Sequence, residues 1–173
     1  MSKTKKLVFF AVMVSLASAL HAVEMLIPNP LPFPGAKLGL ANTVSLLTLA
    51  VYGLKEGIIV SILRVILGSL IAGTFLGLTF MLSMSGAVAS TLVMAFLLRY
   101  VKGLSIVGVS VVGAVTHNIS QLFMVSFVIK TTAIFYYLPF LLLVALPTGA
   151  ATGLIVRSVK RHPTIMRSFG KPS

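Results

Sequence analysis

The chain has 173 residues, of which 58% are hydrophobic and only 9% are charged, and its mean hydropathy is +1.10. A soluble core of this size does not need so much apolar sequence, so we expect an integral membrane protein rather than a nucleic-acid-binding domain. The formal charge of +12 comes from 14 Lys and Arg residues set against Glu24 and Glu56, with no Asp. The absence of cysteine excludes disulfide bonds, thiolate metal sites and a cysteine nucleophile.

Six apolar segments follow one another along the chain. A membrane-spanning helix needs roughly 20 mostly apolar residues, and segments near this length are predicted at residues 7–23, 38–54, 57–75, 79–98, 104–128 and 135–156. We therefore predict a single all-α membrane domain, residues 1–173, with a bundle of six transmembrane helices and a basic tail at residues 157–173. A cleavable signal peptide is an alternative interpretation of the first segment, but its removal would leave five helices.

The basic residues indicate how these segments are oriented, because positive charge accumulates on the cytoplasmic side of membrane proteins. If both termini are cytoplasmic, 11 basic residues lie inside: Lys3, Lys5, Lys6, Lys55, Arg99, Lys102, Arg157, Lys160, Arg161, Arg167 and Lys171. Lys37 and Lys130 would then lie outside, and Arg64 lies within an apolar segment. We expect a multi-pass protein of the plasma membrane, with its basic tail near anionic lipid headgroups.

A proline-rich connection, residues 28–37, joins the first two segments. Proline at every second position prevents a helix and favours an extended path. The connection is either a stiff external linker or a lid over a cavity. In the second interpretation Lys37 stands at the rim of the cavity, and the lid residues are Pro30, Pro32, Phe33 and Pro34.

Arg64 lies in the third segment, where a guanidinium is costly unless it has a partner or contacts water. Neither acid is well placed to neutralise it, because Glu24 belongs at the outer end of the first segment and Glu56 lies roughly 12 Å away along a helix. Two interpretations stay open. Arg64 either extends toward the inner surface and Glu56, or faces a polar cavity where it binds an anionic ligand.

Polar residues recur on one face of the fifth segment. Ser110, Ala114, His117 and Gln121 are spaced by four, three and four residues, which places them on one side of a helix, and Asn118 adjoins them. In lipid such a face must point into the bundle. It serves either as polar contact between helices or as a ligand-binding face, and a lone His117 is weak evidence for proton transfer.

Small residues at four-residue spacing mark a face suited to close helix contact in the first segment, at Ala11, Ser15 and Ala19.

The sequence lacks the residues needed for ATP hydrolysis by a phosphate loop and for catalysis by paired carboxylates. There is no G-x-x-x-x-G-K-[ST] phosphate loop, and two acids in all cannot supply paired carboxylates for acid–base catalysis or for holding Mg²⁺. We therefore expect no catalytic residues, no metal and no cofactor, and binding or transport rather than an enzymatic reaction.

The stretches Pro34-Gly-Ala-Lys-Leu-Gly-Leu-Ala-Asn42 and Leu63-Arg-Val-Ile-Leu-Gly-Ser69 resemble the Gx transporter family, which is also labelled heptaprenyl diphosphate synthase component I. The resemblance implies the fold of the S components of energy-coupling factor transporters, small six-helix proteins that capture a vitamin-like ligand from outside. It also implies a transmembrane coupling subunit and a pair of cytoplasmic ATPases as partners. The small residues of the first segment would form the docking face, and the first loop would form the lid.

The second label implies a different role, but prenyl diphosphate synthases share Asp-rich motifs that hold Mg²⁺, and this chain has no Asp. We therefore predict a substrate-binding membrane component of an uptake transporter that captures a small anionic, vitamin-like or isoprenoid-like ligand. The alternative is a non-catalytic accessory subunit of isoprenoid or quinone metabolism, or of a redox complex, and the shortage of acids disfavours a membrane enzyme. The candidate ligand-binding residues are Arg64, His117, Asn118, Gln121, Lys37 and Asn42.

Overall fold

The structure is a computed structural model and describes residues 3–26 and 39–169, which form helices and turns without a strand. The helices are α1 (Lys3–Leu26), α2 (Leu40–Tyr52), α3 (Leu54–Ile71), α4 (Leu78–Tyr100), α5 (Ile106–Ile129), a short 3₁₀ helix η1 (Ala133–Tyr137), α6 (Leu138–Arg161) and α7 (Pro163–Ser168). The predicted all-α class is confirmed. Each of the predicted apolar segments overlaps one helix from α1 to α6.

Within residues 3–26 and 39–169, four helical stretches are long and apolar enough to cross a membrane: Thr4–Met25, Leu78–Tyr100, Ile106–Ile129 and Ala133–Arg161. The 13 residues of α2 extend about 20 Å, which is less than the ~30 Å of a bilayer's hydrocarbon core. The 18 residues of α3 include three charged side chains, Lys55, Glu56 and Arg64. The chain is therefore a multi-pass membrane protein, and the six-span count and the cytoplasmic position of both termini stay predictions.

Large apolar side chains cover much of the outside of the bundle. Phe127 is 81% exposed, Leu143 69% and Phe123 62%. Several hydroxyl groups lie inside, as where Ser61 of α3 and Thr91 of α4 share a hydrogen bond of 2.8 Å. This distribution suits lipid as the surrounding solvent, because buried polar groups must find partners within the bundle.

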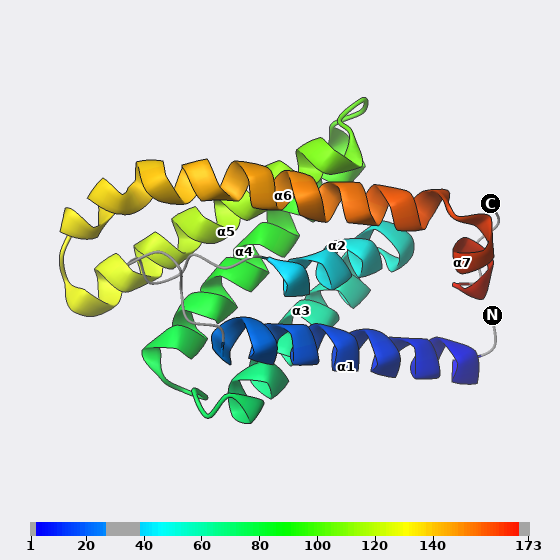
Figure 1. The fold of residues 1–173 in the computed structure, drawn as a ribbon, viewed down its shortest axis with the longest axis horizontal. Helices are drawn as coiled ribbons and strands as arrows, with labels where there is room; N and C mark the ends of the chain where they lie inside the picture. Colours follow the sequence, from blue (N-terminus) through cyan, green and yellow to red (C-terminus); the bar gives the residue numbers. More distant parts are fainter. Residues whose placement is uncertain (1–2, 27–38, 170–173) are drawn as a thin grey trace.

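α5 and α6 lie side by side along much of their length (Figure 1). Two glycines of α6, Gly149 and Gly153, allow this close approach. A Cβ atom at Gly149 would lie 2.8 Å from the Cα atom of Val111, and one at Gly153 would lie 2.6 Å from the Cα atom of Val107. The pair forms a G-x-x-x-G pattern, which brings helix backbones together in membranes.

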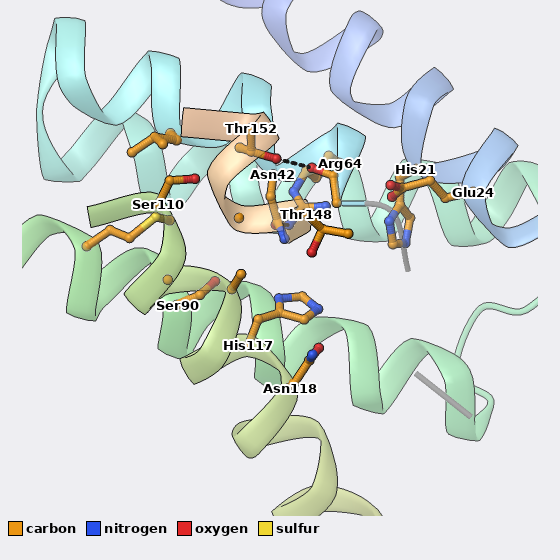
Figure 2. Close-up of a pocket in the computed structure, with 16 residues that line it drawn as sticks. His21, Glu24, Asn42, Arg64, Ser90, Ser110, His117, Asn118, Thr148 and Thr152 are labelled. Carbon is orange, nitrogen blue, oxygen red and sulfur yellow. Dashed lines mark hydrogen bonds between the residues drawn. The ribbon is translucent and has the colours of Figure 1, made fainter. Parts of the chain in front are cut away.

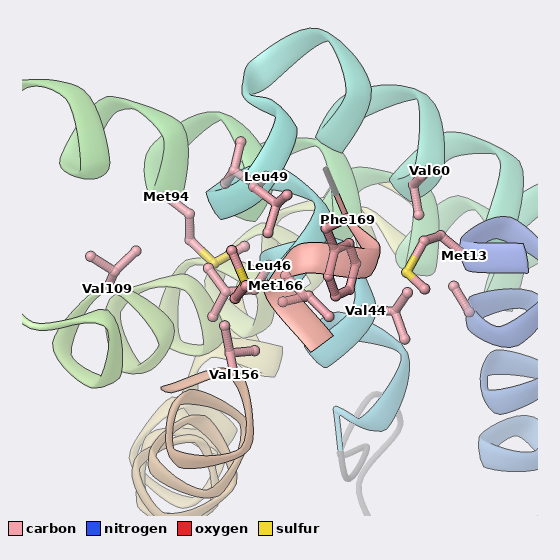
Figure 3. Close-up of a cluster of buried hydrophobic side chains, with 13 residues drawn as sticks. Met13, Val44, Leu46, Leu49, Val60, Met94, Val109, Val156, Met166 and Phe169 are labelled. Carbon is pink, nitrogen blue, oxygen red and sulfur yellow. The ribbon is translucent and has the colours of Figure 1, made fainter. Parts of the chain in front are cut away.

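A cluster of buried apolar side chains joins all the α helices (Figure 3). Leu46 of α2 and Val60 of α3 are fully buried within it, as are Val109 of α5 and Val156 of α6. Its members are Met13, Ala17, Val44, Leu46, Leu47, Leu49, Val51, Val60, Met94, Val109, Val156, Met166 and Phe169. The cluster fixes α2 between α1 and α6, and so positions the first turn of α2 for the polar site described below.

The C-terminal segment folds back against the beginning of α1 (Figure 1). Phe169 is 5% exposed, its ring lies 4.3 Å from the ring of Phe9, and its carbonyl accepts a hydrogen bond of 3.2 Å from the Tyr52 hydroxyl. The start of α1 and the end of α7 therefore lie at the same end of the bundle. The first part of the predicted basic tail is helical, because α6 continues through Arg161.

Candidate functional site

A polar cavity lies inside the bundle, where α1 ends and α2 begins, beside the middle of α5 and α6 (Figure 2). Every helix from α1 to α6 contributes to its wall. The lining residues are His21, Glu24, Gly39, Asn42, Leu46, Arg64, Ser90, Met94, Ser110, Gly113, Ala114, His117, Asn118, Thr148, Gly149 and Thr152. Polar side chains are unusually frequent in this wall for the interior of an apolar bundle, which makes the cavity the candidate site.

Arg64 is the most deeply buried charge of this wall, with 2% of its surface exposed. Its Nη2 donates a hydrogen bond of 2.6 Å to Oδ1 of Asn42, and Nε has no hydrogen-bond partner among the described residues. The predicted alternative in which Arg64 extends toward Glu56 is wrong. Glu56 instead pairs at 2.7 Å with Lys6 of α1.

The expectation that neither acid can neutralise Arg64 also needs correction. Glu24 is 9% exposed and lines the same cavity as Arg64, so its carboxylate can offset the guanidinium charge. Its Oε1 accepts a hydrogen bond of 2.5 Å from the backbone N–H of Leu40. Because α2 begins after Gly39, which offers no side-chain cap, Glu24 supplies the acceptor that the start of α2 lacks.

Two histidines reach the cavity because glycines stand opposite them. His117 of α5 lies against Gly86 of α4, where an added Cβ atom would come within 2.8 Å of the imidazole ring. His21 of α1 lies against Gly68 of α3, with a corresponding distance of 2.6 Å. Both histidines are buried, at 8% and 2% exposure. Sequence reasoning named His117 and missed His21, although Gly68 lies in the second motif quoted above.

The polar face of α5 points into the bundle, as predicted. Ser110, His117 and Asn118 line the cavity, whereas Gln121 is buried outside its wall. Nδ2 of Asn118 donates a hydrogen bond of 3.0 Å to the carbonyl of Leu141, so this residue also joins α5 to α6. Asn118 therefore supports the interpretation of this face as a helix contact, and ligand binding stays a prediction.

α6 contributes the part of the wall that sequence reasoning missed. Thr148 and Thr152 line the cavity on either side of Gly149. The Thr152 hydroxyl donates to the carbonyl of Gly39 at 3.5 Å and accepts from the Thr43 hydroxyl at 3.4 Å. The signal was present in the sequence as one threonine just before the G-x-x-x-G pattern and one within it.

The remaining predicted residues are not among the described residues that line the cavity. Lys37 and the lid residues Pro30, Pro32, Phe33 and Pro34 fall within residues 27–38, outside the described ranges. The predicted docking residues Ala11, Ser15 and Ala19 are exposed on α1. Ala11 and Ser15 line an open apolar groove between α1 and α3. Their exposure suits a docking face, and that role stays a prediction.

The size and donors of the cavity limit its chemistry. Its volume is about 30 Å³, which holds about two water molecules, so a larger ligand requires the surrounding helices to move apart. Within residues 3–26 and 39–169, no three His, Asp or Glu side chains gather to bind a metal ion. The arrangement can hydrogen-bond a small polar group in a site with little water.

A comparison with protein families gives one match, to a family model described as heptaprenyl diphosphate synthase component I, which covers residues 13–159. The match includes the whole cavity wall. It confirms the second label of the family that the sequence resembles, whereas the likeness to Gx transporters and to S components stays a prediction. Comparisons with curated proteins and with solved structures gave no match.

Proposed function

Because the chain belongs to the heptaprenyl diphosphate synthase component I family, we propose that it is a non-catalytic membrane component that binds a small ligand inside its helix bundle. The observation that carries this proposal is the buried guanidinium of Arg64, which faces a cavity rather than the membrane surface. A charged group inside a membrane protein is costly to bury, and such groups commonly mark substrate or ion sites. The protein binds and presents its ligand and does not transform it.

Uptake from outside the cell is the role that the cavity favours. The bundle encloses the site among its helices, and no ATP-hydrolysing motif occurs in the sequence. A partner must then supply the energy, through a transmembrane coupling subunit and ATPases that dock on the exposed small residues of α1. The protein would lie in the plasma membrane with six spans and both termini in the cytoplasm.

An accessory role in isoprenoid metabolism is the second candidate, and the description of the family favours it. In this role the chain assists a separate catalytic subunit that makes prenyl diphosphates, because it has no Asp with which to hold Mg²⁺ itself. Affinity purification of the tagged protein from its own membranes separates the two candidates. Recovery of ATPases and a coupling subunit supports uptake, whereas recovery of a prenyltransferase supports the accessory role.

Ligand binding is tested by native mass spectrometry of the detergent-purified protein, which detects retained small molecules. We expect Arg64→Ala and His117→Ala to lose the retained mass while the amount of protein in the membrane stays normal. Phe127→Ala is the matched control, since Phe127 is 81% exposed and far from the cavity wall. Undiminished retention in both cavity variants would overturn the assignment of the site.

A further inference from the structure

The charges of the cavity wall balance each other. Among the described residues that line the cavity, Arg64 of α3 is the cation and Glu24 of α1 is the anion, and the other lining side chains are neutral polar, apolar or imidazole groups. Both charged groups are at least nine-tenths buried. They line the same cavity, and each has a hydrogen-bond partner on α2, Asn42 for Arg64 and the Leu40 N–H for Glu24.

This balance sets the charge of the ligand that fits. An unpaired charge in a site with little water is strongly disfavoured, whereas a compensated pair is tolerated. With Glu24 already opposing Arg64, a simple anion would leave the cavity with a net negative charge. A ligand without net charge leaves the balance unchanged and can still bond to both partners.

We infer that Glu24 and Arg64 form a self-neutralising pair, and that the cavity takes a ligand without net charge, either zwitterionic or uncharged, that carries both hydrogen-bond donors and acceptors. This inference rests on the proposed ligand-binding function and replaces the anionic ligand expected from the sequence. The donors of the ligand face the carboxylate of Glu24, and its acceptors face Arg64. A diphosphate, with several negative charges, is excluded from this cavity, so a role in isoprenoid metabolism would use another surface.

The chemistry of the two side chains supports this division. A guanidinium offers five N–H donors and no acceptor. Asn42 accepts from Nη2 of Arg64, and the buried Nε has no acceptor among the described residues, so it can donate to a ligand. A carboxylate accepts about four hydrogen bonds, and the Leu40 N–H is one of the donors to Glu24.

A double-mutant cycle tests the pairing without knowledge of the ligand. Glu24→Gln removes the charge but keeps an oxygen that accepts from Leu40, and Arg64→Gln removes the charge but keeps an N–H₂ for Asn42. Each single variant leaves one buried charge uncompensated, so we expect its melting temperature in detergent to fall by about 10 °C. The double variant is expected to melt above both single variants.

Glu56→Gln is the matched control for the cycle, because it removes the other acidic charge of the chain from an exposed pair with Lys6. Its effect should be small and should not depend on Arg64. If the losses of the two cavity variants simply add in the double variant, the charges do not compensate each other and the inference is overturned. The same conclusion follows if Glu24 acts only as a cap for α2, since Glu24→Gln would then melt like the wild type.

Acetate and inorganic phosphate serve as anionic probes in the same thermal assay. At millimolar concentrations neither is expected to raise the melting temperature of the wild type or of Glu56→Gln. Glu24→Gln, with Arg64 uncompensated, is expected to gain several degrees from acetate. Stabilisation of the wild type by either anion, or no gain in Glu24→Gln, would refute the charge rule. Neither outcome would contradict the proposed function, because ligand retention is measured separately by native mass spectrometry.

Discussion

Adding one methyl group at Gly153 of α6 probes the contact that closes one side of the cavity. The Cβ atom of Gly153→Ala would lie 2.6 Å from the Cα atom of Val107, about 0.8 Å short of the 3.4 Å at which ordinary contact begins. The obstructing atom belongs to the backbone, so α5 and α6 must separate. Overpacking of this kind typically costs about 1–3 kcal/mol, and the higher helix propensity of Ala offsets up to about 1 kcal/mol.

From the middle of that cost range, the net loss is about 1–2 kcal/mol, which corresponds to a fall in melting temperature of roughly 2–8 °C for a chain of this size. Thermal unfolding of the detergent-purified protein, followed by circular dichroism, measures it. Ser158→Ala is the control, because Ser158 is exposed on the same helix and gains helix propensity without a clash. A melting temperature of Gly153→Ala equal to or above that of the control would refute the close packing of α5 on α6.

Three further predictions concern the cavity and the end of the bundle where α1 begins. Gly86→Ala pushes the His117 ring out of place, so retention of the ligand in native mass spectrometry should fall while the protein still folds. The Lys6 hydrogen bond lowers the pKa of Glu56 below 4.5, so this exposed pair contributes at most about 1 kcal/mol to stability above that pH. The contribution is lost in Glu56→Gln, and it is lost in the wild type as the pH falls through the lowered pKa. Melting scans between pH 3 and 7 measure both effects. Tyr52→Phe removes a hydrogen bond to the C-terminal segment and should speed its cleavage by trypsin, with an unchanged cleavage rate arguing against that contact.

The helical framework could be predicted from sequence because it depends on local composition. Runs of apolar residues identified each of the long helices, since a bilayer-sized apolar segment has few other stable conformations. The inward direction of the α5 polar face followed from helical spacing alone. The lengths of α2 and α3 could not be predicted from the sequence, because Gly53, at φ 100°, ends α2 and immediately precedes α3.

The site was harder to predict, since its main contacts join residues far apart in the chain. Arg64 was recognised by its cost within an apolar segment, but its partner Glu24 belongs to another helix and looked peripheral in the sequence. His21 gave no signal of its own, because it becomes a wall residue only through the close approach of Gly68. The cavity volume depends on the packing of six helices and has no counterpart in sequence patterns.

The chain order of the Arg64 partners bears on how the protein enters the membrane. A lone arginine at the centre of an inserting helix costs about 2.5–3.5 kcal/mol during translocon-mediated insertion. Glu24 and Asn42 lie on α1 and α2, so both have already been synthesised when α3 leaves the ribosome. If α3 spans the membrane as predicted, it inserts when both partners are already present, and we expect α1, α2 and α3 to enter the membrane as one unit.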